Sequence, residues 1–345
     1  MANPLIVTPN VNPNVASVDT LTAQGMIANF YGTSWNFLDY VEGKIDSSTL
    51  IDLITIPGSI AYPNYSPSGA AVRRASVAVN TIMLQQNRYA RMIDIQKGIL
   101  EGSTDEMAAV YMAQLNSIAS SGYASSFMQR EAVKALIKNT TRTYFDGQAF
   151  FSASHPVNPN DSTTVAITTG LATYANLATG KAFSTTNLLN GIIAAKQLCW
   201  DDGQPIQTNK FTVFAAPALE PLIAHVLKSE FLGFASAFSA SDTSSTQSSP
   251  VQTLMKNGKN GKTEIDFVIM PEYPVTSGGG VATDWYLATG FMPPWALKIN
   301  RQPEFIPRFD PRDENVFTRD ALEALFQVTF AVDLLHPLSM MKFSA

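Results

Sequence analysis

The sequence is short of charge and nearly free of cysteine. Asp, Glu, Lys and Arg make up 15% of its 345 residues, well below the roughly 25% that is usual for a soluble domain. Because the cores of protein interfaces are depleted in charge, this shortage favours a chain whose surface is largely covered by other subunits. The single cysteine, Cys199, excludes a disulfide within the chain and a zinc site built on cysteines.

Membrane segments and basic clusters are also missing. No apolar run approaches the ~18 residues of a membrane span, and the N-terminus lacks the basic and apolar regions of a secretory signal. We therefore expect that the protein is made in the cytoplasm and does not contact a membrane. The formal net charge is −5, and the nearest basic cluster is Arg73-Arg74, with Arg88 and Arg91 further along. Phosphate binding needs several cations on one face, so solvated, scattered charges are the favoured interpretation.

The first half of the chain predicts an arm, a hairpin and a long helix. Residues 1–16 are rich in Asn and Pro and cannot bury a core by themselves. Residues 49–95 contain two runs of strand-forming residues around a tip rich in Pro and Gly, which predicts a long hairpin. Residues 104–138 carry apolar residues at helical spacing, and a Ser-Ser-Gly stretch at 120–122 is the expected bend.

The second half predicts a mixture of helices and strands, so the fold class is α+β. Ser184 or Thr185 is expected to cap a helix that reaches Cys199 and buries that thiol, and Pro217 is expected to open another helix. In residues 325–335 apolar and polar residues alternate, which predicts one buried face. Strands are expected at 211–214, 265–270, 285–288, 296–306 and 325–335.

One motif gathers residues that catalysts use. Residues 146–157 read DGQAFFSASHPV, and Asp146, Ser152, Ser154 and His155 offer an acid, two hydroxyls and a base. A serine triad needs these groups held against one another, which closeness in sequence does not supply. The chain contains no nucleophile elbow, phosphate loop or dinucleotide-binding glycine pattern.

The three histidines point away from catalysis. His155 and His336 each precede a proline, which favours extended or turn backbone, and we interpret both as turn residues. His225 lies alone in a predicted helix, without the convergent ligands of a metal site. The sequence therefore predicts no catalytic, cofactor-binding or metal-binding residues, and a hydrolase using His155 is the least favoured interpretation.

The motif and the order of elements resemble those of a known family. The run from Asp146 to Val157 is similar to a pattern close to DGQxFFxxxHPV in the major head proteins of Mu-like tailed phages, although Ser154 stands where members often carry an acid. The element order resembles the Hong Kong ninety-seven type of tailed-phage major capsid protein. This resemblance implies an arm (1–48), an extended loop (49–95), a peripheral domain (96–186 and 296–345) with spine helix 104–138, and an axial domain (187–295).

The resemblance implies a structural protein and not an enzyme. Such subunits assemble with copies of themselves into hexamers and pentamers of an icosahedral head that encloses double-stranded DNA without sequence-specific binding. Separate scaffold and portal proteins, and in some cases decoration proteins, are the further expected partners. The implied location is the virion capsid, after synthesis in the host bacterium. Another shell or virion protein, encapsulin-like or from a tail, is the second interpretation, because an arm and a long hairpin favour it too.

Overall fold

The computed structural model of the chain describes residues 35–46, 51–57, 79–96, 121–138, 143–228, 251, 255, 263–273, 280–308, 312, 318–319 and 321–345. In chain order its elements are η2 (Phe37–Tyr40), β1 (Val41–Asp46), β2 (Ile51–Pro57), β3 (Val79–Gln85), β4 (Asn87–Gln96), α4 (Ser121–Lys138), β5 (His155–Pro156), β6 (Thr173–Tyr174), β7 (Leu177–Ala178), α5 (Thr185–Lys196), β8 (Lys210–Ala215), η3 (Pro217–Leu219), α6 (Glu220–Lys228), β9 (Glu264–Ile269), β10 (Trp285–Ala288), β11 (Trp295–Arg308), β12 (Ala321–Leu334) and β13 (Met340–Phe343).

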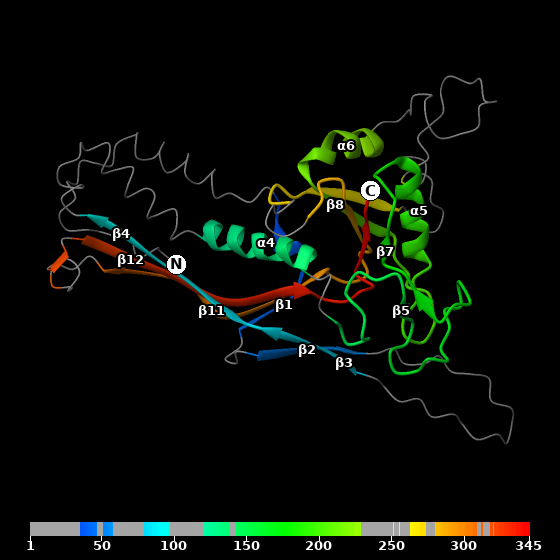
Figure 1. Ribbon diagram of the computed structural model, residues 1–345, viewed down its shortest axis with the longest axis horizontal. Helices are drawn as coiled ribbons and strands as arrows, with labels where there is room; N and C mark the ends of the chain where they lie inside the picture. The colour runs from blue at the N-terminus through cyan, green and yellow to red at the C-terminus, as the bar shows by residue number, and fades with distance from the viewer. Residues whose placement is uncertain are drawn as a thin grey trace, which may run out of the picture.

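A long four-stranded sheet, in the order β1-β11-β12-β4, extends from the compact part of the molecule (Figure 1). At its centre β11 and β12, each of 14 residues, pair antiparallel along nearly their whole length. β4 pairs antiparallel with β12, and β1 pairs parallel with β11. Helix α4 lies along one face of this sheet. The helix and β12 share one buried cluster, to which they contribute Ala132, Val133, Leu136, Val328 and Phe330.

A second sheet, in the order β7-β13-β10-β8-β9, forms the compact part together with α5 and α6 (Figure 1). All four residues of its central strand β10 are buried, and successive side chains of a strand point to opposite faces. Tyr286 and Ala288 belong to the same cluster as the long sheet, whereas Trp285 and Leu287 belong to a second cluster with α5 and α6. Strand β10 therefore joins the two cores.

The predicted hairpin is present but shorter than 49–95. β2 and β3 pair antiparallel from Ile51 with Gln85 to Pro57 with Val79. Residues 58–78, which include the predicted tip, lie outside the described part of the chain. Strand β4 follows directly after β3, but it pairs with β12 and not with the first strand of the predicted hairpin. The second half of the run is thus a strand of the long sheet, because the edge of β12 offers ten residues of backbone pairing.

Two other predicted segments are only partly described. Helix α4 is the C-terminal part of the predicted helix 104–138, and residues 104–120 lie outside the described residues. The arm was expected to span 1–48, yet Val41–Asp46 forms β1 and adds a parallel strand to the long sheet. Residues 1–34 are not among those described. No helix in the described part of the chain is both long and apolar enough to cross a membrane.

Strand β12 buries both of its faces, which corrects the prediction of one. The polar positions of the alternation, Gln327, Thr329 and Asp333, are buried as well, with 4–8% of their surface exposed. Gln327 accepts a hydrogen bond from Arg88 and donates one to Glu304, so long side chains of the flanking strands cover it. A central strand flanked on both sides keeps its polar groups buried when they have such partners.

Helix α5 begins where predicted but ends earlier. The Ser184 hydroxyl accepts a hydrogen bond from the Asn187 backbone N–H and caps the helix, as predicted. The helix ends at Lys196, and Cys199 follows it in an isolated bridge with Pro205. Cys199 is buried, as predicted, but it lies outside the helix. Pro217 opens the short η3 helix that continues into α6.

Replacing Leu136 with Ala tests the packing of α4 on the long sheet. Leu136 is 0% exposed, so the truncation leaves a cavity and should lower the free energy of unfolding by about 2–5 kcal/mol. Urea unfolding of the unassembled chain measures this. Met92→Ala on β4 is the control, because Met92 is 49% exposed and its truncation should change stability by less than about 0.5 kcal/mol. Equal losses for both variants would contradict the described packing.

Candidate functional site

A tight turn brings Asp146 toward His155. The Tyr144 N–H donates to the Gln148 carbonyl, and the Gly147 N–H donates to the Tyr144 carbonyl. Gly147 has a φ of 77°, a left-handed conformation that glycine adopts without strain. One carboxylate oxygen of Asp146 accepts the Gln148 N–H at 3.1 Å, which leaves the other oxygen to face the histidine.

His155 is fully buried, and both ring nitrogens face acceptors. Its Nδ1 lies 2.5 Å from Asp146 Oδ2. Its Nε2 lies 3.0 Å from the Phe150 carbonyl oxygen and 3.1 Å from Asn176 Oδ1. Both ring nitrogens are thus engaged by groups of the fold, whereas a general base needs a nitrogen lone pair that faces a nucleophile. The expectation that His155 is a turn residue is wrong: its extended X-Pro step forms β5, which pairs with β6.

Asn176 links the segment of this histidine to the C-terminal segment of the chain. Its amide nitrogen donates to the carbonyl oxygens of Phe150 at 2.6 Å and Pro337 at 3.0 Å. Its amide oxygen accepts the backbone N–H of Ser152 at 2.8 Å. Asn176 is fully buried, yet nothing in the sequence distinguishes it from the other residues of a loop rich in Thr and Asn. We call Asp146, His155 and Asn176 the polar lock.

The serines of the motif do not complete a triad. The Ser152 hydroxyl donates to Gln148 Oε1 at 3.4 Å and accepts the Ser154 N–H at 3.2 Å. Ser154 is exposed. The structure therefore brings Asp146 and His155 together but directs the Ser152 hydroxyl to other partners. This arrangement supports the polar lock as a structural element and argues against a hydrolase that uses His155.

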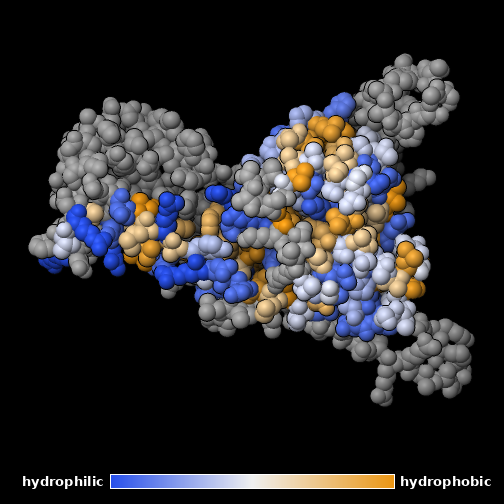
Figure 2. All heavy atoms as spheres, viewed as in Figure 1, coloured by the Kyte–Doolittle hydropathy of each residue, from blue (hydrophilic) through white to orange (hydrophobic). Residues whose placement is uncertain are grey.

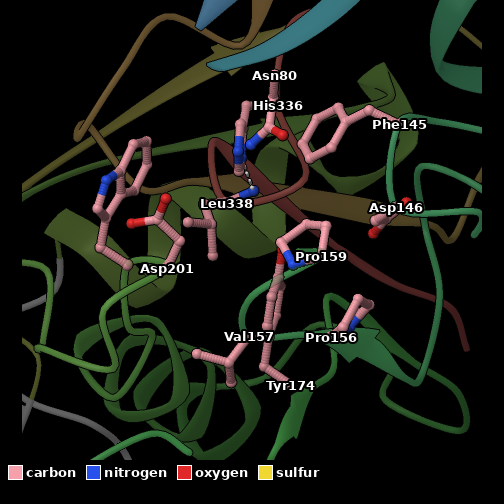
Figure 3. A pocket seen from close by; sticks show the side chains of 11 residues that line it. Asn80, Phe145, Asp146, Pro156, Val157, Pro159, Tyr174, Asp201, His336 and Leu338 are labelled. Carbon is pink, nitrogen blue, oxygen red and sulfur yellow. Dashed lines mark hydrogen bonds between the residues drawn. The ribbon is translucent and has the colours of Figure 1, made fainter. Parts of the chain in front are cut away.

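His336 is a second buried histidine beside the polar lock. Its ring lies between Phe145 and Trp200, with centroids 5.2 Å and 5.4 Å away. Its Nδ1 accepts the Leu338 N–H at 3.0 Å, the bond drawn as a dashed line in Figure 3, and its carbonyl accepts the Ser339 N–H. His336 is thus a turn residue, as predicted. Burial lowers the pKa of His336 to about 3. The Asp146 carboxylate partly opposes this lowering of the pKa, and His155 adds to it.

The hollow beside His336 is too small for a substrate. It is bordered by the rings of Phe145 and Trp200, by Pro156 and Pro159, and by Asp146 (Figure 3). Its cavity volume is about 20 Å³, which is room for one water molecule. Pockets that bind small molecules are typically about 300–1,000 Å³. The hollow is a packing feature of the joint between the motif and the C-terminal segment.

The other candidate residues are dispersed. His225 is exposed on α6, and Asp201-Asp202 forms a turn with Gly203, in which Asp202 accepts the Gln204 N–H. In the described ranges no group of His, Cys, Asp and Glu has the arrangement to hold a metal ion. Arg73-Arg74 lies outside these ranges, and the Arg88 guanidinium is bonded to Gln327.

Comparisons with known proteins identify the fold. No family model matches the chain, and no curated protein matches it in sequence. A structure from Mycobacterium phage Patience matches with a TM-score of 0.53 and 10% identity, over 97% of this chain and 90% of that chain. The capsid of a native GTA particle matches with a TM-score of 0.51 and 12% identity, over 90% of both chains. The cyanophage Pam1 capsid matches with a TM-score of 0.51 and 11% identity, over 90% and 91%. The chain therefore has the α+β fold of phage capsid structures.

Replacing Asn176 with Ala tests the polar lock. The variant removes the hydrogen-bond partner of the Pro337 carbonyl and of the Ser152 N–H, and it leaves the Phe150 carbonyl with His155 alone. Each unpaired buried group costs about 1–3 kcal/mol. We expect the free energy of unfolding to fall by about 2–5 kcal/mol, measured by urea denaturation. Asn160→Ala is the matched control, because Asn160 is exposed in the same loop region and should lose less than about 0.5 kcal/mol. A stable Asn176→Ala variant would show that the lock does not hold this region.

Replacing His336 with Asn tests its buried neutral state. The unfolded histidine titrates near pH 6.5 and the folded one at about 3, so between these values the unfolded state binds more protons. Wild-type stability therefore falls as the pH drops below about 6.5. Asn keeps an acceptor for the Leu338 N–H but does not titrate. Between about pH 6 and 5, the free energy of unfolding of the wild type should fall, relative to that of this variant, by up to about 1.4 kcal/mol per pH unit. A constant difference would contradict burial of the neutral ring.

Proposed function

We propose that the chain is the major capsid subunit of a tailed phage. In this role it assembles with copies of itself into hexamers and pentamers of an icosahedral head. The proposal rests on the match to three solved structures, two of which are capsids. Each match covers at least 90% of this chain and at least 90% of the other chain. The virion capsid is then its location, following synthesis in the cytoplasm of the host bacterium.

The shape and chemistry of the described residues support a structural role. The long sheet and the β2–β3 pair provide extended surfaces that a compact enzyme does not need (Figure 1). The polar lock has the residue types of a catalytic site, but its side chains form their hydrogen bonds with other groups of the fold. Its neighbouring hollow holds no more than a water. We therefore assign no catalytic residue, cofactor or metal.

The two cores support a division into domains. We assign the long sheet with α4 to a peripheral domain and the second sheet with α5 and α6 to an axial domain. Strand β13 returns from the end of the chain into the second sheet, so the two domains share the C-terminal segment. Residues 1–48 and 49–95 are assigned to the arm and the extended loop, apart from β1 and β4, which belong to the long sheet.

The charge of the subunit fits a container for DNA. A net charge of −5 disfavours tight binding to a polyanion that has to enter and leave the shell. We propose that the head encloses double-stranded DNA without sequence-specific contacts and that separate scaffold and portal proteins, with optional decoration proteins, complete it. A strongly positive inner face in an assembled particle would contradict this proposal.

Expression of the full chain tests the function directly. The purified chain, alone and together with its scaffold protein, should form hexamers, pentamers or closed shells. Gel filtration followed by negative-stain electron microscopy distinguishes these particles from a monomer. A chain that stays monomeric in both preparations would overturn the proposal.

A further inference from the structure

One loop presents apolar side chains to solvent while its backbone is held firmly. Val165, Ile167 and Leu171 are 47%, 64% and 59% exposed. They lie in a single tight loop, because the Ala166 N–H donates to the Leu171 carbonyl at 2.8 Å and the Gly170 N–H donates to the Ala166 carbonyl at 2.7 Å. We call these three residues the apolar knob. Figure 2 shows that apolar residues reach the surface of the compact part at its right-hand margin.

The inner side of this loop is anchored to the end of α5 and the turn beyond it. The Ile167 N–H donates to the Gly203 carbonyl at 2.9 Å, and the Thr168 hydroxyl donates to the Gln197 carbonyl at 2.7 Å. Ala166 points inward and packs with Cys199. The outward side chains are therefore preorganised, and a partner that contacts them orders little additional backbone.

The chemistry around the apolar knob identifies the kind of partner. Residues 162–180 contain no Asp, Glu, Lys, Arg or His. DNA binding would need Lys or Arg here, and membrane-surface binding would need a larger apolar face with basic residues beside it. Depletion of charge with exposed aliphatic side chains is the composition of a protein interface core. In a shell built from one chain, the protein available at every position is another copy.

We propose that the apolar knob is a contact surface for a second copy of this chain within a ring of subunits, an inference that rests on the proposed capsid function. Rings close through head-to-tail contacts, so the apolar knob meets a different surface of the neighbour and not the neighbour's own knob. Burial of the three aliphatic side chains supplies the attraction, and the lack of charged residues in the segment 162–180 itself limits the cost of burying ions.

The double variant Ile167→Asp with Leu171→Asp tests the contact in the full-length chain. Both side chains are exposed in the free subunit, so the variant should fold, with an unchanged near-ultraviolet circular dichroism spectrum. Sedimentation velocity should show association weakened by about a hundredfold or more, since two charges enter an apolar contact. Asn160→Asp adds charge to the same loop region outside the apolar knob and should assemble as the wild type does, as should the conservative Ile167→Val.

The outcomes separate this proposal from the proposed function. If the wild type assembles and the folded double variant assembles equally well, the apolar knob is not a contact, although the capsid function stands. If the wild type forms no assembly, the function fails and the inference falls with it. Should the double variant misfold, a photo-cross-linking residue at position 171 decides: cross-links between two copies in assembled particles support the contact, and their absence overturns it.

Discussion

The antiparallel pairing of β11 with β12 is the interaction on which the rest of the structure depends. Strand β1 pairs only with β11, and β4 pairs only with β12 among the described strands, so both edges of the long sheet are attached through this pair. Helix α4 is fixed to it as well, because the Trp295 indole donates a hydrogen bond to the Ala132 carbonyl. Strand β12 is buried on both faces and has to satisfy its polar groups internally, which Asp333 does by accepting a hydrogen bond from the Tyr144 hydroxyl.

The polar lock resolves the same constraint at the joint between the two cores. Residues 143–178 reach from Tyr144, in the core of the long sheet, to β7 of the second sheet, and they carry backbone carbonyls and N–H groups into a buried region. His155 and Asn176 supply hydrogen-bonding groups for these backbone atoms, and the Asp146 carboxylate lies against the other ring nitrogen of the histidine. A fully connected buried network rigidifies its surroundings, whereas a partly connected one is costly. Residue types that resemble a catalytic triad are therefore present for their hydrogen-bonding capacity.

Local sequence patterns predicted local structure well, but they did not predict which distant segments pair with each other. The strand at 285–288 and the Ser184 cap depend on neighbouring residues, and both appear where the sequence places them. The assignment of β1 and β4 to the long sheet depends on which free edge they meet, which no periodicity encodes. For the same reason the sequence identified His155 but neither its burial nor its partner Asn176, which lies 21 residues further along the chain. The resemblance to phage capsid proteins supplied the fold that periodicity alone did not.

Weak, uncharged contacts between subunits can hold a ring together if each contact is repeated around it. Full burial of one aliphatic side chain contributes about 1.5–3 kcal/mol, so a contact of a few such residues is insufficient for a stable isolated dimer once the entropy of association is included. In a ring every copy makes the contact twice, once with each neighbour, and closure makes the last contacts intramolecular. Weak, uncharged contacts are then stable in the complete ring but reversible before it closes, which allows misplaced subunits to dissociate during assembly.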